Sequence, residues 1–182
     1  MVQDTSSVII VRQATLADLE IKEDIQKIIN GAYRSKGGWT DESALVNGQR
    51  ATLEDMETHI KDTVNVLFLA FEKKAGEDQM TVVGTVQIQP DGPDEAEIGL
   101  LSVDQSLQSR GIGGRLVRTA MDEMKIRGYK RAVIHVLDVR TEILAWYRKL
   151  GFVETGERTP FVWPELLKVK SLEFLVLKKS LI

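Results

Sequence analysis

A strand, a glycine-rich turn and a helix follow one another directly in the segment 98–127, and this succession constrains the fold more than any other feature. An apolar run ends at Val103, and glycines follow at Gly111, Gly113 and Gly114. Apolar residues then recur at helical spacing. The start of such a helix presents unpaired backbone N–H groups and the positive end of the helix dipole, and glycine lets a ligand approach the backbone closely. The turn is therefore predicted to bind phosphate groups.

Neither standard nucleotide-binding motif matches this turn. A P-loop would need Lys-Ser or Lys-Thr after the glycines, and a dinucleotide fingerprint beginning at Gly111 would need a small residue where Leu116 stands. The pattern present is Q-x-x-G-x-G, formed by Gln108, Gly111 and Gly113. The sequence therefore indicates a phosphate-containing ligand of a different kind.

Composition indicates one domain spanning 1–182, with 43% hydrophobic and 28% charged residues. The net charge of −3 gives no general reason to expect a nucleic acid or membrane partner. The chain has no cysteine, which excludes disulfides, thiolate metal sites and a cysteine nucleophile. No apolar run has the length of a signal peptide or membrane span, so we expect a cytoplasmic location, with a nuclear one left open.

The hydrophobic periods predict an element order of β-α-α-β-β-β-α-β-α-β-β. The segment Tyr33–Gln49 is rich in glycine and polar residues, and we expect it to be a binding loop. Strands are expected over 8–12, 66–71, 82–88, 96–103, 131–137, 152–154 and 172–178, and helices over 19–32, 52–60, 112–127 and 142–150.

Three motifs within this order resemble the GNAT superfamily of N-acetyltransferases. Q-x-x-G-x-G resembles its acetyl-CoA pyrophosphate loop, A-W-Y-R-K-L-G-F at 145–152 resembles the end of its fourth helix, and F-L-V-L-K-K-S-L at 174–181 resembles its terminal strand. The resemblance implies the α/β (α+β) GNAT fold. That fold is a single mixed sheet of about seven strands, flanked by about four helices and splayed at the cofactor strand. One departure is Arg140, which stands where many members carry an asparagine that contacts the cofactor.

The resemblance implies acetyl-CoA as cosubstrate. No metal is expected, because the chain has no cysteine and its two histidines are far apart in sequence. Backbone N–H groups of the glycine turn would hold the two phosphates, and the strand ending at Val103 would open to admit pantetheine. Arg110 would pair with a phosphate, and Arg115 would be solvated or near the adenosine end. The residues expected at the cofactor are Leu101, Ser102, Val103, Gln108, Ser109, Arg110, Gly111, Ile112, Gly113, Gly114 and Arg115.

The resemblance also suggests roles in a direct attack of the amine on the thioester. Tyr147, in the N-terminal half of the fourth helix, would protonate the departing thiolate, and the Val103 N–H would stabilise the oxyanion. Glu97 would accept the proton of the amine directly or through water. An ordered water, His59 or His135 are alternative bases. Equally open are a packing role for Tyr147 and a solvent-facing Glu97.

The amine acceptor is expected to lie between two loops. Aromatic and acidic residues suit a cationic amine, and those expected at the acceptor are Tyr33, Trp39, Asp41 and Glu42, with Trp163 opposite on the loop 158–164. A small or amino-acid-like amine is expected. The alternatives are a protein N-terminal or lysine acetyltransferase, a non-catalytic acyl-CoA-binding module, and an interaction domain with Trp39 and Trp163 as anchors. A closed pocket would favour a small acceptor, and a long groove a protein. A homodimer is left open.

Overall fold

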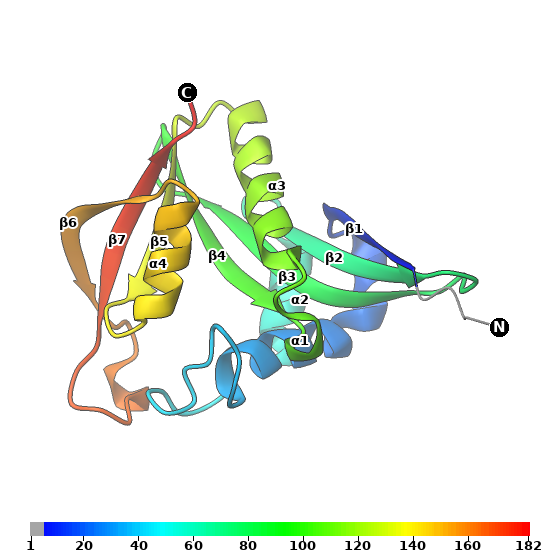
Figure 1. Cartoon of the computed structure of the whole chain (residues 1–182), viewed down its shortest axis with the longest axis horizontal. Helices are drawn as coiled ribbons and strands as arrows, with labels where there is room; N and C mark the ends of the chain where they lie inside the picture. Colours follow the sequence, from blue (N-terminus) through cyan, green and yellow to red (C-terminus); the bar gives the residue numbers. More distant parts are fainter. Residues whose placement is uncertain (1–5) are drawn as a thin grey trace.

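A seven-stranded sheet in the order β1-β2-β3-β4-β5-β7-β6 runs through the molecule (Figure 1). All neighbouring strands are antiparallel except β4 and β5. The computed structural model describes residues 6–182. The strands are β1 Ser7–Gln13, β2 Val66–Lys74, β3 Met80–Pro90, β4 Glu95–Val103, β5 Arg131–Leu137, β6 Val153–Pro160 and β7 Glu173–Ser180. The helices are α1 Lys22–Arg34, α2 Leu53–Lys61, α3 Ile112–Ile126 and α4 Thr141–Lys149, with 3₁₀ turns η1 Leu16–Ile21, η2 Gln105–Leu107 and η3 Pro164–Leu166.

The predicted fold class, a single mixed sheet with four helices, is confirmed. Helices cover both faces of the sheet, because alternate side chains of a strand point to opposite faces. One core joins β2 to α3 and α4, and a second joins β2 to α1 and α2. The β2 residues in the first core are Val66, Phe68 and Ala70, and those in the second are Leu67, Leu69 and Phe71. This arrangement brings the start of α3 next to the end of β4.

A bulge bends β4 in its middle. Gln87 of β3 pairs with Gly99 and Thr85 pairs with Ser102, so two residues of β4 lie opposite one residue of β3. Leu100, inside the bulge, has a φ of 47°, which is uncommon for a residue other than glycine. The Thr85 hydroxyl donates to the Leu100 carbonyl at 2.6 Å and thereby stabilises this conformation.

The parallel strands β4 and β5 separate after three residue pairs, of which Glu97 with Val133 is the last. The rest of β4 therefore has no partner on its β5 side, and Figure 1 shows the two strands diverging. The Asp104 N–H bonds the Val83 carbonyl of β3 at 2.8 Å. Because successive N–H groups of a strand alternate in direction, the N–H of Val103 faces the gap.

The loop after α1 and the segment after β6 are joined to each other. Val46 forms an isolated antiparallel bridge with Leu167. The Asn47 N–H bonds the Leu166 carbonyl at 2.7 Å, and the Lys168 N–H bonds the Leu45 carbonyl at 2.8 Å. A small apolar core, which includes Val46, Leu137, Phe161 and Leu172, stabilises this junction. The two segments therefore form one continuous wall.

Two predicted elements differ from the structure by more than the extension of a strand by two or three residues at its ends. The first helical segment begins as the 3₁₀ turn η1, and its α-helical part runs from Lys22 to Arg34. The strand expected over 152–154 extends to Pro160, so the part of the expected loop from 158 to 160 is strand. Gly156 has a φ of 87°, and the register of β6 with β7 shifts around it. This irregularity and the exposure of most of the strand remove the alternation of apolar and polar residues from which a strand is recognised in a sequence.

Asp18 connects β1 to the first helical segment, and we expect Asp18→Asn to lower the free energy of unfolding by about 2 kcal/mol. The Asp18 carboxylate is buried and accepts two hydrogen bonds from Arg12 at 2.8 Å and one from the Thr15 N–H at 2.7 Å. Mainly through the Arg12 hydrogen bonds, the pKa of Asp18 is lowered. The stabilisation is therefore present above the unfolded-state pKa of about 4 and is lost as pH falls through the folded-state value.

Urea unfolding of the wild type and Asp18→Asn at pH 7 and pH 3 measures this contribution. The difference between the two proteins should shrink at pH 3. Asp24→Asn, at an exposed carboxylate with only a 3.6 Å contact to Lys27, serves as the control and should unfold like the wild type. Equal midpoints for Asp18→Asn and the wild type at pH 7 would contradict the assignment.

Candidate active site

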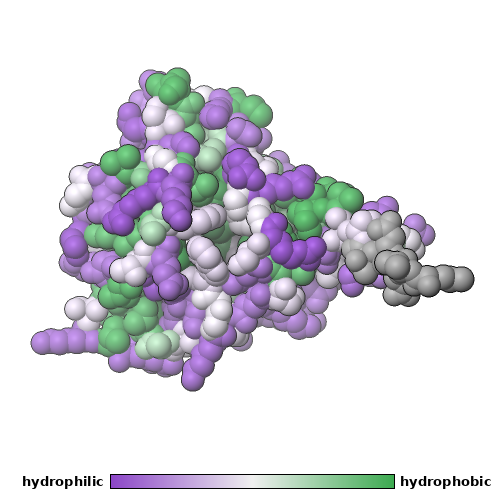
Figure 2. Space-filling model, viewed as in Figure 1, coloured by the Kyte–Doolittle hydropathy of each residue, from purple (hydrophilic) through white to green (hydrophobic). Residues whose placement is uncertain are grey.

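A first cavity of about 270 Å³ lies between the end of β4, the glycine turn and α4. Most residues expected at the cofactor line this cavity. They are Leu101, Ser102, Val103, Gln108, Ser109, Gly111, Ile112, Gly113 and Gly114. Thr40, Ile143, Trp146 and Tyr147 also line it. In Figure 2, residues of intermediate hydropathy lie near the centre of the visible face, and strongly hydrophobic residues form separate patches.

The glycine turn presents unpaired backbone donors to this cavity. Gly111 is the N-cap of α3 with a φ of 81°, and the first helical hydrogen bond runs from the Arg115 N–H to the Gly111 carbonyl at 3.1 Å. The N–H groups of Ile112, Gly113 and Gly114 therefore have no helical acceptor. Together with the helix dipole they suit an anionic group, so the turn fits the phosphates of a CoA ligand.

Gln108 closes this turn. Its side-chain oxygen accepts from the Trp39 N–H at 3.2 Å, and its side-chain nitrogen donates to the Val103 carbonyl at 3.4 Å. The two arginines expected near the cofactor do not line the cavity. Arg110 contacts Glu72 at 3.4 Å, and Arg115 donates to the carbonyl of Ile9. Both guanidinium groups are thus directed toward β1 and β2, because these strands offer them oxygen acceptors.

A second cavity, of about 730 Å³, lies on the other side of the gap. Leu101 and Tyr147 line both cavities, so the two meet at these residues. The polar residues of the second cavity come from the end of α1, the segment between α1 and α2, α2, the neighbouring strands β3, β4 and β5, and β6. They are Tyr33, Arg34, Glu42, Arg50, Asp55, His59, Gln87, Gln89, Glu97, His135 and Thr159.

Glu97 and His135 form a pair at the point where β4 and β5 separate. Glu97 Oε1 lies 2.9 Å from His135 Nδ1, and the His135 ring contacts Phe174 edge-on with centroids 6.2 Å apart. The hydrogen bond from Glu97 is the main cause that raises the pKa of His135, against the opposing effect of burial. Two of the residues expected as candidate bases are therefore in contact.

His59, in contrast, is held neutral. The Gln89 amide donates to Gln87 Oε1 at 2.8 Å, and Gln87 Nε2 lies 2.9 Å from His59 Nδ1. Because the Gln87 oxygen is already an acceptor, its nitrogen donates to His59, and the His59 proton is on Nε2. Burial lowers the pKa of His59 in agreement with this tautomer.

Tyr147 is in the last turn of α4, which extends over Thr141–Lys149, and not in its N-terminal half as expected. The ring is 7% exposed and packs edge-on against Trp146 and Phe152. Its hydroxyl has no hydrogen-bond partner within residues 6–182, where no side-chain polar atom is fully buried without a partner. The hydroxyl therefore opens onto the cavities. Burial raises the pKa of Tyr147, so the phenol stays protonated at neutral pH.

The residues expected at the acceptor do not all line the same cavity. Tyr33, Glu42 and Trp163 line the second cavity, whereas Trp39 lines the first. Trp39 contacts Trp146 edge-on at 6.4 Å, and its carbonyl accepts from Arg140. Asp41 lines neither cavity, because its carboxylate accepts from the N–H groups of Ser43 at 2.8 Å and Gly37 at 3.2 Å.

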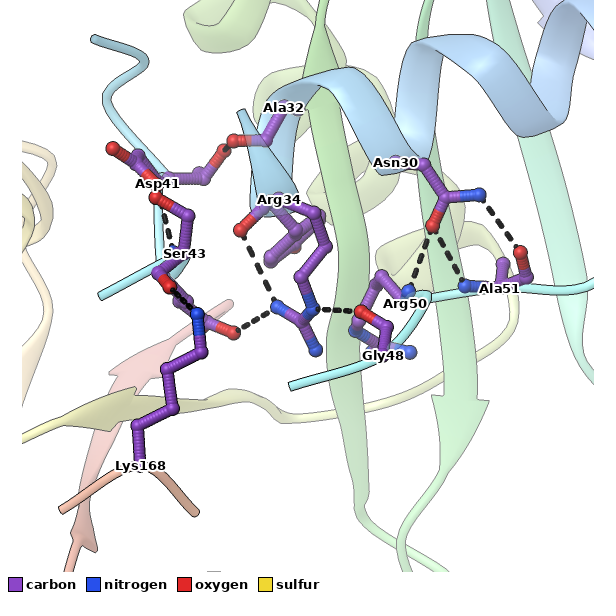
Figure 3. Close-up of polar contacts among 12 residues, drawn as sticks. Asn30, Ala32, Arg34, Asp41, Ser43, Gly48, Arg50, Ala51 and Lys168 are labelled. Carbon is purple, nitrogen blue, oxygen red and sulfur yellow. Dashed lines mark hydrogen bonds and ion pairs between the residues drawn. The ribbon is translucent and has the colours of Figure 1, made fainter. Parts of the chain in front are cut away.

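Figure 3 shows how the loop after α1 is held next to the second cavity. Arg34 donates to the Gly48 carbonyl at 2.9 Å and pairs with Glu42 at 2.9 Å. The Asn30 side chain accepts from the N–H of Arg50 at 2.7 Å and donates to the Ala51 carbonyl at 2.8 Å. Burial nevertheless raises the pKa of Glu42. The loop backbone thus has a defined position relative to α1.

The sequence analysis missed Arg34, Arg50, Gln87 and Gln89 as cavity residues. A signal was present for the two glutamines, because they are spaced by two in an otherwise apolar strand and therefore point to one face. Within residues 6–182, no three acidic or histidine side chains are grouped so as to hold a metal ion. In the same range, no helix has the length and apolar character needed to cross a bilayer.

This fold and glycine turn agree with the comparison with known families. The model of the Acetyltransferase (GNAT) family matches residues 25–152, and the chain belongs to this family. The expected resemblance is thereby confirmed.

Curated relatives are also acetyltransferases. N-acetyltransferase 8B of Homo sapiens is 33% identical over 104 residues, which cover 54% of this chain and 46% of that protein. Mycothiol acetyltransferase of Corynebacterium glutamicum (strain R) is 30% identical over 66% of this chain and 36% of that protein. N-alpha-acetyltransferase RimI of Mycobacterium tuberculosis is 38% identical over 43% of this chain and 49% of that protein. The chain thus matches less than half the length of each of these relatives.

Solved structures share the fold over almost the whole chain. An N-acetyltransferase from Staphylococcus aureus Mu50 superposes with a TM-score of 0.72 and 13% identity, covering 96% of this chain and 98% of that one. NAA60 of Arabidopsis thaliana, in complex with a bisubstrate analogue, superposes with a TM-score of 0.70 and 15% identity, covering 95% and 98%. At such identities the likeness establishes the fold alone.

Proposed function

We propose that the chain is a single N-acetyltransferase domain over 1–182, which moves an acetyl group from acetyl-CoA to a primary amine by direct attack. The observation that carries this proposal is the meeting of the two cavities at Leu101 and Tyr147. The first cavity has the anion-binding turn, and the second has proton-accepting groups. Acetyl-CoA supplies the thioester from which the acetyl group is transferred.

The first cavity would hold the cofactor through backbone groups. The free N–H groups at the start of α3 bind the phosphates, and the unpaired edge of β4 around Leu101 and Ser102 bonds the pantetheine amides. Gln108 and Ser109 border the turn. Arg110 and Arg115 have acceptors elsewhere in the protein, so neither is required for this binding.

Three groups would carry out the chemistry. The Glu97–His135 pair takes the proton that the amine loses as it attacks the thioester carbon. The Val103 N–H, which faces the gap, donates to the carbonyl oxygen as negative charge develops there. The Tyr147 hydroxyl gives its proton to the departing sulfur. No covalent acetyl-enzyme is needed, and the chain has no cysteine to form one on sulfur.

The bridge between Val46 and Leu167 supports a small acceptor. It joins the loop after α1 to the segment after β6, so a chain cannot lie across that wall without breaking the bridge. A polypeptide acceptor is the alternative, since one relative is named an N-alpha-acetyltransferase. Release of CoA thiol with a panel of small amines and short peptides tests the proposal. Amine-dependent release supports it, and acetyl-CoA binding without release for any amine contradicts it.

The proton-accepting role predicts a specific titration. The pKa of His135 should lie above the ordinary histidine value of about 6.5, and kcat/KM should rise with pH through that pKa as the pair loses its proton. In Glu97→Gln the negative charge is absent and the neutral amide oxygen is a weaker acceptor for a protonated imidazole, while burial still lowers the pKa, so the pKa of His135 should fall. NMR titration checks this cleanly, because the sequence contains only two histidines.

His59 is the internal control in that titration. Its pKa is lowered mainly by burial and does not depend on Glu97, so its curve should be the same in the wild type and in Glu97→Gln. An unchanged pKa of His135 in the variant would show that the two side chains are not coupled.

A further inference from the structure

We infer that the acceptor of the second cavity carries a carboxylate as well as the reacting amine, and that Arg50 binds this carboxylate. The inference rests on the proposed function, because it names the class of acceptor for the same site. It follows from an inventory of the charged groups that line the cavity.

Most of these groups already have a partner. Arg34 is paired with Glu42 at 2.9 Å and also bonds the Gly48 carbonyl. Glu97 is paired with His135 at 2.9 Å. The Asp55 carboxylate accepts from the N–H and hydroxyl of Thr52, at 2.7 and 2.8 Å, and so caps α2.

Arg50 is the exception. Among the residues from 6 to 182, its guanidinium forms neither an ion pair nor a hydrogen bond, although it lines the cavity. The Glu42 and Asp55 carboxylates interact with Arg50 only at longer range, without a hydrogen bond to it. An arginine that lines a cavity and has no hydrogen-bonded anion is available for an anion supplied by a ligand.

The position of Arg50 is fixed without use of its guanidinium N–H groups. Its backbone N–H, together with that of Ala51, is held by the Asn30 side chain at 2.7 and 3.1 Å, as Figure 3 shows. The guanidinium carbon lies 5.2 Å from the centre of the Tyr33 ring. Burial raises the pKa of Tyr33 to about 12, so this ring is a neutral cation–π partner at physiological pH. The in-plane donors, which bind a carboxylate in the bidentate manner, remain free.

The other polar groups of the cavity agree with an anion at this end and an amine at the other. His59 is neutral and carries its proton on Nε2. It can therefore donate a hydrogen bond to the carboxylate of the ligand, and it has no negative charge that would repel this group. The proton acceptor of the proposed reaction, the Glu97–His135 pair, lies on β4 and β5. Arg50 and His59 come instead from the segments before and within α2. A small molecule with an amine and a carboxylate, such as an amino acid, satisfies both ends.

Matched acceptors test this directly. The L-amino acids and their carboxamides both carry the amine and differ in the charge of one group. Because the carboxamide also lowers the pKa of that amine, kcat/KM is compared per concentration of unprotonated amine. In the wild type, kcat/KM for the best amino acid should exceed that for its carboxamide at least roughly tenfold, which is about 1.4 kcal/mol. In Arg50→Gln this preference should disappear through a higher KM for the amino acid, with the carboxamide little affected. Arg127→Gln, at an arginine paired with Glu123 on α3 outside both cavities, should retain the preference.

Two kinetic results would each overturn the inference. One is an equal kcat/KM for amino acids and carboxamides in the wild type, and the other is an equal loss for both acceptors in Arg50→Gln. A failure of the proposed function looks different, because then no amine of either series would be acetylated while acetyl-CoA still bound. Calorimetric titration of the same amino acids into the CoA complex of both proteins measures carboxylate binding without turnover, and binding that is unaffected by Arg50→Gln would also overturn it.

Discussion

Replacing Gly113 with leucine is expected to raise the dissociation constant of acetyl-CoA roughly 100-fold or more, because the side chain would displace the phosphates from the start of α3. Loss of two charge-assisted hydrogen bonds at about 1.5 kcal/mol each corresponds to this factor. A Cβ at Gly113 would lie 3.7 Å from Val103 Cγ2 and 3.9 Å from the Trp146 ring. These are ordinary contacts, so the backbone accepts a side chain there and the rest of the leucine extends into the first cavity.

Calorimetric titration of acetyl-CoA into the variant provides the measurement. Gly31→Leu is a matched control, because Gly31 is also inside a helix and a Cβ there would have no neighbour within 4 Å. Both variants should remain folded, as judged by circular dichroism. Wild-type affinity for acetyl-CoA in Gly113→Leu would refute the assignment of the phosphates to this turn.

Tyr147→Phe is expected to lower kcat roughly 100-fold to 1,000-fold while the affinity for acetyl-CoA stays within about twofold, in the range for loss of a general acid. The substitution removes only the hydroxyl, which has no hydrogen-bond partner within residues 6–182. The ring contacts with Trp146 and Phe152 are retained. The free energy of unfolding should therefore be unchanged, so that a loss of turnover reports on the chemistry alone.

Steady-state kinetics of CoA release, with the best amine found in the panel, provides the comparison. Tyr129→Phe removes a hydroxyl from a residue that lines neither cavity and should leave kcat at the wild-type value. If Tyr147→Phe also turned over at the wild-type rate, Tyr147 would not be the acid, and a packing role would remain for it.

The lining of the first cavity, which the proposed function assigns to the cofactor, was predictable because its parts are adjacent in the chain. The end of β4, the turn and the start of α3 are continuous in sequence, and nine of the residues expected there line one cavity. Glycine at 111 is needed for a left-handed φ at the N-cap, so the sequence itself carries the geometry. The element order was predictable for the same reason, since each strand and helix has its own hydrophobic period.

The acceptor half depends on contacts between distant segments, which local patterns do not encode. Glu97 and His135 meet only because β4 and β5 are parallel neighbours that separate directly after the pair Glu97 with Val133. The wall formed by Val46 and Leu167 depends on a single bridge between two loops. Arg50 differs from any surface arginine only by its stacking on Tyr33 and its lack of an ion pair. None of these features produces a periodic pattern in the sequence, so none of them could be predicted before the structure was known.

Trp39 lies elsewhere than the other aromatic residues expected at the acceptor. Its aromatic character suggested an acceptor wall, and the structure has its side chain against Trp146 in the lining of the first cavity. The position is set by Arg140, which bonds the Trp39 carbonyl from the N-cap of α4. Arg140 stands where many family members carry asparagine, so its role here is a contact that the family motif does not describe.

The measurement that tests the central claim most directly is calorimetric titration of the purified protein with acetyl-CoA, followed by titration in the presence of CoA. The account predicts saturable binding to one site per chain, with CoA as a competitor, because the phosphates at the start of α3 are common to both ligands. Absence of acetyl-CoA binding by the folded wild-type protein would contradict the account at the glycine turn, on which every later step depends.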